Sequence, residues 1–383
     1  MSRAPRLLLA AGGTGGHLFP GVAVAELAQR QAGAAVLFVG TSGGMEKDVI
    51  PQLGFSLRFI PAEQLRGRTR WGKIRAMGVA GYGVGAAWRI IREFAPDVIF
   101  SIGGYASAPT VLAGWLQRIP CVLLEPNAIP GLANRFLGWF ASRVCLGFET
   151  AARFFPTHKV VHTGNPVRSA LRPTLQPAAP DKPFTILVFG GSAGAHRLNH
   201  IVPQALARLH KTRSGQKEAD PVPAIQIIHQ TGQAEYVAVS ASYATAGIAA
   251  RVVPFIDAMQ EVYAEADLVI CRAGAITAAE LTLLGKPAIL IPYPYAADDH
   301  QRANAEALVQ AGAAVMLLDH TLSPELLEQT VARLVQHRDT LGNMARAAAT
   351  LGRPDATAAV VQTCFACAPC VSSSGQEVSC QEK

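Results

Sequence analysis

A short glycine-rich pattern occurs twice in the chain, and it constrains the fold more than any other feature. Leu8–Gly16 and Ile186–Gly194 align without a gap, at a constant offset of 178 residues. In each copy an apolar run typical of a buried strand ends in a glycine-rich turn, and a helical pattern follows. The repeat therefore predicts two similar halves, each opening with a strand, a tight turn and a helix.

Apolar runs of strand length alternate with longer helical patterns, which is typical of parallel sheets buried on both faces. The strands expected in the first half are Arg6–Ala10, Val36–Val39, Leu57–Ile60, Val98–Ser101, Cys121–Leu124 and Val144–Leu146. Those expected in the second half are Thr185–Phe189, Ile225–His229, Arg251–Val253, Leu268–Cys271, Ala288–Ile291 and Ala314–Leu317. The predicted fold class is α/β, with two Rossmann-like doubly wound domains that face one another across a ligand cleft.

The domain boundary is expected in a proline-rich stretch between the halves. Four prolines in the thirteen residues Leu171–Pro183 predict a stiff, extended connector. We expect an N-terminal domain over residues 1–168, a linker over 169–183 and a C-terminal domain over 184–363, whose last helix could pack back on the N-terminal domain. Residues 364–383 are expected to form a disordered tail. Its cysteines, Cys364, Cys367, Cys370 and Cys380, raise a zinc or iron–sulfur site as the alternative, but the position of the fourth fits no standard spacing.

Composition describes a globular protein with a basic surface. Half of the residues are apolar and 16% are charged, which excludes a disordered or collagen-like chain. The net charge of +7 favours a phosphorylated ligand, a nucleic acid or an anionic membrane surface, and does not choose among them. Cys121, Cys145 and Cys271 each stand alone in an expected strand, so a reducing compartment is expected. Met1–Ala11 resembles a signal peptide, but its apolar run is too short, so the protein is expected to stay inside the cell.

The first glycine turn, Gly12–His17, has the features of a phosphate-binding loop. Backbone N–H groups and a helix N-terminus bind an anion closely where side chains are missing. The spacing is not the dinucleotide fingerprint, no acidic residue follows the second strand, and no Walker lysine follows the glycines. A tight turn without a ligand is the alternative, which the second copy of the turn makes less favourable.

A third strand–turn–helix pattern spans Cys271–Glu280, with Gly274 at the turn. The carboxylate of Glu280 is placed to accept hydrogen bonds from two vicinal sugar hydroxyls, while the helix N-terminus faces a diphosphate. The alternative is that Glu280 only favours an early helix position. Further on, a helix expected from Asp298 places His300 and Asn304 on one face, which by itself is also typical of an ordinary capped helix.

The sequence contains neither D-x-D nor H-E-x-x-H, so no metal and no other cofactor are expected. Helix termini and basic side chains would then neutralise a diphosphate. Arg168 is a candidate for that role, and a solvated surface arginine is the alternative.

A basic and apolar segment, Arg66–Arg92, suggests docking on an anionic bilayer. It carries basic residues without an acid at its start and an apolar helical pattern with Tyr82 and Trp88 after it. Several of these apolar residues are also needed to pack on the sheet. The uncharged stretch Val98–Gln117 is long enough for a membrane check, but its glycines, serines and proline predict strand, loop and helix.

Taken together, the motifs resemble the bacterial MurG family in order and spacing, from about Leu7 to about Val361. They are Gly12–Gly21, Ser101–Tyr105, Glu125–Asn127, Gly164–Arg168, Gly190–Ala195, Cys271–Glu280 and His300–Gln301. The resemblance implies a glycosyltransferase B-type fold and an inverting transfer of N-acetylglucosamine from UDP-GlcNAc to the 4-hydroxyl of undecaprenyl-diphospho-N-acetylmuramyl-pentapeptide. This reaction converts lipid I to lipid II in peptidoglycan synthesis, and so bears on cell shape and cell division.

The resemblance also implies partners and site residues. The partners are UDP-GlcNAc, lipid I, the cytoplasmic face of the cell membrane and, as an open possibility, cell-wall or division proteins; no nucleic acid is expected. The donor-binding residues implied are Thr14, Gly15, Gly16, Asn127, Arg168, Ser192, Ile256, Ala275, Ile276, Thr277, Ala278, Ala279, Glu280 and Gln301. The sequence departs from the family's usual residues at Ala193, Ala273 and Pro126, which puts single contacts in doubt.

An inverting transfer needs a base for the attacking hydroxyl and stabilisation of the departing UDP. His17 is the first candidate for the base, although nearby phosphates would favour its protonated form and a charge-stabilising role. Glu125 is the second. Two other functions stay open: a UDP-sugar 2-epimerase or glycolipid transferase with this architecture, and a nucleotide-binding or membrane scaffold without catalysis.

Overall fold

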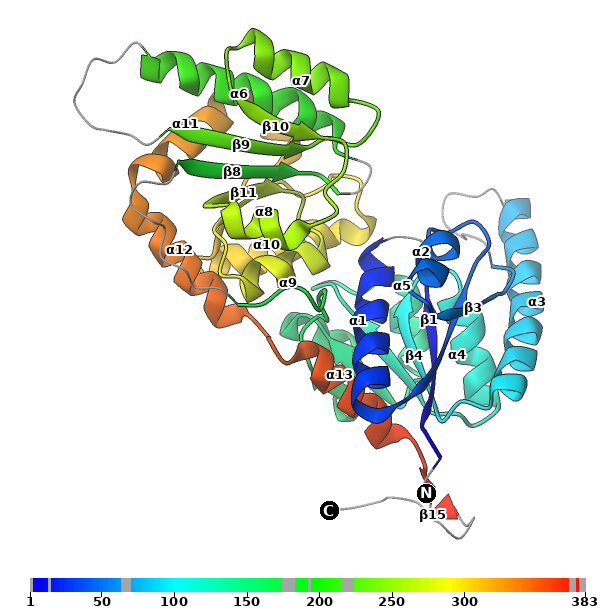
Figure 1. Cartoon of the computed structure of the whole chain (residues 1–383). Coiled ribbons are helices and arrows are strands. Elements are labelled where there is room, and N and C mark those ends of the chain that lie inside the picture. Colours follow the sequence, from blue (N-terminus) through cyan, green and yellow to red (C-terminus); the bar gives the residue numbers. More distant parts are fainter. Residues whose placement is uncertain are drawn as a thin grey trace. The chain divides into compact units, whose positions relative to one another are not determined.

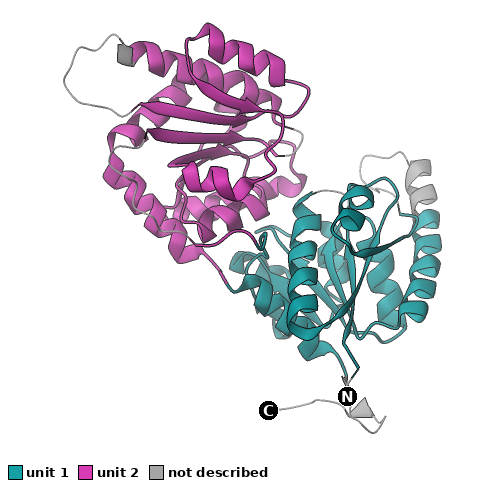
Figure 2. Cartoon of the chain, in the orientation of Figure 1, with its two compact units in different colours: residues 1–169, 355–383 teal, residues 170–354 magenta. Residues whose placement is uncertain are grey.

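The structure, a computed structural model, describes residues 3–12, 15–62, 70–173, 183–191, 194–214, 224–371 and 377–378. Thr14 and Ser192 therefore lie outside the described residues, as do Arg66 and Arg68 of the basic segment, most of the predicted linker and Cys380. The chain divides into two compact units, residues 1–169 with 355–383 and residues 170–354 (Figure 2).

Unit 1 is a doubly wound domain around a parallel seven-stranded sheet of order β3-β2-β1-β4-β5-β6-β7 (Figure 1). Its strands are β1 (Arg6–Ala11), β2 (Ala35–Gly40), β3 (Ser56–Phe59), β4 (Val98–Gly103), β5 (Cys121–Glu125), β6 (Arg143–Leu146) and β7 (Val160–His162). Its helices are α1 (Gly15–Ala32), α2 (Glu46–Gln52), α3 (Arg70–Phe94), α4 (Ser107–Leu116), α5 (Leu132–Leu137) and α13 (Ala356–Cys367), with 3₁₀ turns η1 (Glu149–Phe154) and η2 (Thr157–Lys159). A two-residue pair, β14 (Cys370–Val371) and β15 (Glu377–Val378), follows α13.

Side chains of the central strand β1 alternate between two hydrophobic cores. Leu7 and Leu9 belong to the core beneath α1 and α13, whereas Leu8 belongs to the core on the side of α3 and α4. This alternation follows from the two-residue period of a strand, and burial on both faces explains the unbroken apolar run in the sequence.

The end of the chain corrects the expected tail. Instead of becoming disordered at Cys364, the chain continues as α13 to Cys367 and packs against α1 in unit 1. Val360, Val361 and Cys364 are buried in the same core as Leu7. Their apolar side chains leave water there, which stabilises the helix far more than its own propensity could.

Unit 2 is a second doubly wound domain, around a parallel six-stranded sheet of order β10-β9-β8-β11-β12-β13. Its strands are β8 (Phe184–Phe189), β9 (Ile225–Gln230), β10 (Ala250–Val253), β11 (Leu268–Cys271), β12 (Ala288–Leu290) and β13 (Ala314–Met316). Its helices are α6 (His196–Ser214), α7 (Tyr236–Thr245), α8 (Met259–Glu265), α9 (Ala275–Leu283), α10 (His300–Gln310), α11 (Pro324–Gln336) and α12 (Arg338–Leu351), with 3₁₀ turns η3 (Ala297–Asp299) and η4 (Asp319–Thr321).

All twelve predicted strands are confirmed to within two residues at their ends. The prediction missed β7, a three-residue edge strand whose side chains are only half-buried and which therefore lacks a strong apolar signal. Cys121, Cys145 and Cys271 are buried and unbridged in β5, β6 and β11, as expected. Val98–Gln117 forms β4 and α4. Among the described helices, none combines the length and the apolar character that a membrane span needs.

Candidate functional site

In unit 1 the glycine turn lies at the carboxyl edge of the sheet, where the strand order reverses around β1. Ligands of doubly wound sheets bind at this point. The turn approaches the loop after β4 so closely that a Cβ at Gly104, whose φ is +87°, would lie 2.5 Å from the carbonyl oxygen of Gly12. This contact, together with the positive φ, explains why the Ser101–Tyr105 motif needs glycine at position 104.

His17 and Glu125, the two predicted catalytic residues, belong to one polar cluster. A Cβ built on Gly103 would lie 3.4 Å from His17 Nε2 and 3.7 Å from Asn134 Nδ2, so imidazole and amide meet at the same glycine. Asn134 in turn donates through Nδ2 to Glu125 Oε2 at 3.0 Å. Asn134 is a residue that sequence analysis missed, because it lies on α5 and no local pattern links it to His17.

The Glu125 carboxyl is almost fully buried at the end of β5. Burial raises its pKa to about 7, although hydrogen bonds from Asn127 and Asn134 oppose the shift. Its Oε1 accepts from the backbone N–H of Asn127 at 2.9 Å and from the Asn127 side chain at 3.2 Å. A carboxyl with a pKa near neutrality is suited to accept a proton at physiological pH.

Glu46 is a second residue that the sequence analysis missed. It is fully buried at the start of α2, where Oε1 accepts from the backbone N–H and the hydroxyl of Thr41. A Cβ at Gly12, Gly40 or Gly44 would come within 2.5 Å of its side chain. The Glu46 side chain thus packs against Gly12, at the start of the first glycine turn, and three glycines leave room for it.

The other predicted residues of unit 1 lie near the same edge. Gly15 and Gly16 form the first turn of α1. Arg168 places its guanidinium over the ring of Phe19, 4.5 Å from the ring centroid, and is half-buried. It is therefore not the solvated surface arginine of the alternative interpretation, and the packing holds it beside α1.

In unit 2 a cavity of about 650 Å³ opens at the corresponding sheet edge. It lies beyond the ends of β8, β11, β12 and β13, so the second glycine turn lines it as the repeat predicts. Gly194, with φ +80°, needs to be glycine because a Cβ would lie 1.9 Å from the carbonyl oxygen of Thr231. The residues that line the cavity are Gly190, Gly194, Ala195, His196, Arg197, Arg272, Tyr293, Pro294, Tyr295, Gln301 and Asp319.

The third predicted turn is confirmed, with Gly274 in an extended conformation at the start of α9. Ala275 to Ala279 form the first turns of that helix. Glu280 lies in its second turn with 6% of its surface exposed, and it accepts a hydrogen bond from the Tyr263 hydroxyl at 3.0 Å. The Tyr263 hydroxyl thus orients the carboxylate. A glutamate that only favoured an early helix position would not need such a partner. Ile256 is buried in the loop after β10.

The helix predicted from Asp298 begins at His300, as α10. Asp298 and Asp299 both take left-handed conformations, with φ of +53° and +54°, and neither side chain caps the helix. Consecutive strained residues of this kind are found at functional sites. Gln301 accepts the backbone N–H of Tyr293 at 2.9 Å, which fixes it at the cavity wall. Asn304 is buried and donates to the carbonyl oxygen of Ala273.

A pair of arginines joined by Asp319 was also missed. Arg272 Nη1 donates to Asp319 Oδ2 at 2.6 Å, and Arg197 Nε lies 3.3 Å from Asp319 Oδ1. All three residues line the cavity. Only Arg272 lies within a motif that the sequence analysis singled out, and nothing in the sequence connects it with a carboxylate 47 residues away.

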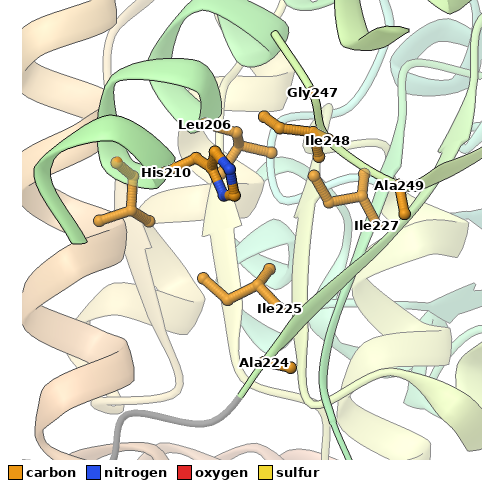
Figure 3. Close-up of a pocket in the computed structure, with 9 residues that line it drawn as sticks. Leu206, His210, Ala224, Ile225, Ile227, Gly247, Ile248 and Ala249 are labelled. Atoms are coloured by element: carbon orange, nitrogen blue, oxygen red, sulfur yellow. The ribbon is translucent and has the colours of Figure 1, made fainter. Parts of the chain in front are cut away.

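A second cavity of unit 2, about 450 Å³, has a different character. Figure 3 shows it among Ile225, Ile227, Ile248 and His210, at the amino ends of β9 and β10. This is the sheet edge opposite to the glycine turns, so it is not part of the predicted site. Among the described residues no group of three His, Cys, Asp or Glu side chains is arranged to hold a metal ion.

Unit 1 also exposes a group of large apolar side chains, the aromatic patch. Its members are Trp115, Leu116, Leu132, Phe136 and Trp139, which are 49% to 72% exposed. The ring of Phe140 packs against aromatic rings of both α4 and α5: its centroid lies 5.0 Å from that of Trp115 and 5.1 Å from that of Phe136. In the predicted membrane segment, by contrast, Ile91 is buried and Trp88 packs on the sheet, while Tyr82 is exposed.

Family models match both halves of the chain. The N-terminal domain of glycosyltransferase family 28 matches residues 7–146, and the C-terminal domain of that family matches residues 185–360. A relative from Geobacter metallireducens, named UDP-N-acetylglucosamine–N-acetylmuramyl-(pentapeptide) pyrophosphoryl-undecaprenol N-acetylglucosamine transferase, is 44% identical over 93% of this chain and 97% of its own. A relative of the same name from Myxococcus xanthus is 42% identical over 94% and 92%.

Solved structures agree with these matches. The crystal structure of MurG from Acinetobacter baumannii has a TM-score of 0.76 and 34% identity, over 94% of this chain and 99% of that one. A UDP-GlcNAc 2-epimerase from Neisseria meningitidis, bound to UDP-GlcNAc, has a TM-score of 0.65 at 14% identity over 94% and 100%, which reflects the shared fold alone. The chain belongs to glycosyltransferase family 28 and, within it, to the MurG family.

Proposed function

We infer that this chain transfers N-acetylglucosamine from UDP-GlcNAc to the 4-hydroxyl of the muramyl residue of lipid I, forming lipid II. The identity of 41–44% to relatives with that activity in their name, over nearly the whole of both chains, carries the inference. The local chemistry supports it, because unit 1 has a buried acid that Asn134 links to an imidazole, and unit 2 has a cavity with basic side chains. Inversion at the anomeric carbon needs both kinds of site.

The donor is proposed to bind at the carboxyl edge of unit 2. Glu280 would accept hydrogen bonds from the ribose hydroxyls, and Ile256 would pack at the uracil. The N-terminal turn of α9 and Gln301 would face the diphosphate and sugar. Thr14, Gly15, Gly16 and Asn127 are proposed contacts of the donor sugar, with Arg168 and Ser192 at its diphosphate.

An assay of UDP release tests this function. Purified protein is incubated with UDP-GlcNAc and a short-chain lipid I analogue, and UDP and the glycosylated product are measured with and without the acceptor. We expect UDP release that requires the acceptor and matches product formation one to one. Conversion of UDP-GlcNAc without acceptor would favour an epimerase, and binding of UDP-GlcNAc without turnover would favour a scaffold.

Replacement of His17 by alanine is expected to lower GlcNAc transfer at least about tenfold, which corresponds to about 1.4 kcal/mol of activation free energy. The imidazole and the Asn134 amide both approach Gly103, and Asn134 donates to the Glu125 carboxyl, so we propose that His17 takes up a proton or balances charge in this cluster. Steady-state rates with a saturating acceptor measure the change. His158→Ala, in an exposed 3₁₀ turn of the same unit, is the control. Full activity of His17→Ala would remove the residue from the proposed site.

The acceptor is anchored in a bilayer by its polyprenyl chain, and we propose that the aromatic patch of unit 1 docks the protein on the cytoplasmic membrane surface. Aromatic side chains favour the interfacial region of a bilayer. Basic residues adjoin the patch: Arg118 lies two residues after Leu116, and Lys159 donates to the carbonyl oxygen of Trp139 at 2.8 Å. Basic residues of this kind attract anionic headgroups. Arg66–Arg92 would add to the same attraction.

The double replacement Phe136→Ser and Trp139→Ser is expected to lower binding to vesicles that contain phosphatidylglycerol about tenfold, because two exposed apolar side chains are lost. Co-sedimentation measures the bound fraction. Transfer to a water-soluble acceptor analogue should stay unchanged. Val237→Ser, 75% exposed in unit 2, is the matched control. Equal vesicle binding by the double variant and the native protein would contradict the docking proposal.

A further inference from the structure

Asp319 begins the 3₁₀ turn η4 just after β13, at the wall of the unit 2 cavity. Its side chain is 12% exposed, and it belongs to no motif of the sequence. A carboxylate beside a site for an anionic ligand is unfavourable by its charge alone. Contacts of Asp319 with basic side chains compensate for this unfavourable charge.

The bonds of Asp319 join three separate segments of unit 2. Its Oδ2 accepts from Arg272, at the end of β11, at 2.6 Å. Its Oδ1 lies 3.3 Å from Arg197 Nε in the first turn of α6, and that nitrogen also donates to the Asp319 carbonyl oxygen at 2.9 Å. Arg197 is further held by the carbonyl oxygen of Leu322. The carboxylate thus connects the helix after the second glycine turn with the turn that follows β11.

Arg272 depends on this carboxylate for its orientation. Among the described residues, Arg272 donates through Nη1 to Asp319 and to the carbonyl oxygens of Ile291 and Pro292, both at 3.1 Å. Its Nε is buried without a hydrogen-bond partner among the described residues. Of the three acceptors, the carboxylate is the closest and the only charged one, so it makes the strongest of the bonds.

Contacts of Arg272 also link Asp319 to Gln301. Arg272 anchors the backbone at Ile291 and Pro292, and its guanidinium lies 5.6 Å from the ring centroid of Tyr293. The backbone N–H of Tyr293 then donates to Gln301 Oε1. A chain of direct contacts therefore runs from Asp319 through Arg272 and Tyr293 to Gln301.

We propose that Asp319 is a positioning residue of the donor site: it holds Arg272 and Arg197 so that the loop from Ile291 to Tyr293 presents Gln301 to the diphosphate of the nucleotide sugar. The proposal rests on the donor site proposed above. Asp319 itself does not touch the donor. Its contribution is preorganisation of the groups that do.

The test compares UDP with uridine as ligands of Asp319→Asn, which keeps the shape of the side chain and removes its charge. Titration calorimetry is expected to give a Kd for UDP about tenfold higher than in the native protein and an unchanged Kd for uridine. The KM for UDP-GlcNAc should rise with it, while the KM for the acceptor stays the same. Asp319→Glu should recover part of the UDP affinity, because the carboxylate can still reach an arginine.

Glu265→Gln is the control, since it removes the carboxylate from an exposed pair with Arg251 in the same unit. It should bind both ligands as the native protein does. An equal loss of UDP and uridine in Asp319→Asn would indicate a general structural defect and overturn the proposal. Tighter UDP binding would overturn it as well, because Asp319 would then act only by repelling the diphosphate.

A second variant keeps the test decisive if Asp319→Asn fails to fold. Arg272→Lys retains the positive charge, but its ammonium ends one bond short of the position of Nη1 and is too short to bind the three acceptors, so this variant should show the same selective loss of UDP. Unchanged UDP affinity in this variant would refute the positioning role. If the native protein itself binds neither UDP nor UDP-GlcNAc, the proposed donor site fails first, and the role of Asp319 fails with it.

Discussion

Replacement of Glu125 by glutamine is expected to lower the rate of GlcNAc transfer about a thousandfold, within the range by which general bases accelerate reactions. The carboxyl lies at the carboxyl edge of β5 in the cluster with His17 and Asn134, and burial brings its pKa to about 7. A group with this pKa is ionised often enough near neutral pH to accept the proton of the attacking hydroxyl. Glutamine keeps the size of the side chain and cannot take up that proton.

The pH dependence of kcat/KM identifies the role. The native enzyme should gain activity as pH rises through about 7, when the Glu125 carboxyl loses its proton. The residual activity of Glu125→Gln should lack this limb. Glu149→Gln, on the exposed turn η1, is the control. If Glu125→Gln retains the rate and the limb, His17 is left as the candidate base.

The same substitution has a predicted effect on stability. Between about pH 4.5 and 7 the folded protein keeps the Glu125 proton that the unfolded chain has released, so its free energy of unfolding falls as pH rises through this window. The loss amounts to at most about 3 kcal/mol. Glu125→Gln should lack this loss. Urea unfolding should therefore show that the free energy of unfolding of the variant, relative to that of the native protein, is higher at pH 8 than at pH 4.5.

Replacement of Glu280 by alanine is expected to lower kcat/KM for UDP-GlcNAc about a hundredfold. Two hydrogen bonds from ribose hydroxyls to a buried carboxylate would be lost, each worth about 1.5 kcal/mol or more. The hydrogen bond from the Tyr263 hydroxyl to Glu280 would be lost as well. Initial rates at varied donor concentration measure the effect.

A ligand without ribose hydroxyls separates recognition from folding. Native protein should bind UDP much more tightly than 2′,3′-dideoxy-UDP, and Glu280→Ala should bind the two alike. Tyr263→Phe keeps the carboxylate and removes only its internal donor, so it should keep most of the discrimination. Undiminished discrimination in Glu280→Ala would place the ribose elsewhere.

Much of the local architecture was predictable because it depends on neighbours in the sequence. Apolar runs predicted the strands, and glycines predicted the turns after β1, β8 and β11. The edge strand β7 escaped because it buries little apolar surface. The start of the tail was misplaced because Cys364 owes its burial to strands more than 200 residues earlier in the chain, such as β1 and β6.

The aromatic patch shows why the same sequence pattern has two interpretations. Leu132, Phe136 and Trp139 follow helical spacing, which normally marks the buried face of a helix. Here the stripe is exposed, at 69%, 55% and 72%. Periodicity gives the direction in which side chains point relative to one another, and only packing decides whether that direction is core or solvent.

By itself the sequence determined the two doubly wound halves, the glycine turns, the family and the majority of the candidate residues, because these follow from short-range patterns. Only the tertiary structure brought Asn134 between His17 and Glu125, packed Glu46 against Gly12, and joined Arg272 to Asp319. Within each unit, these groups come from different strands, helices and turns. Their proximity and burial, and the raised pKa of Glu125, arise from the exclusion of water by the folded chain, which no local pattern records.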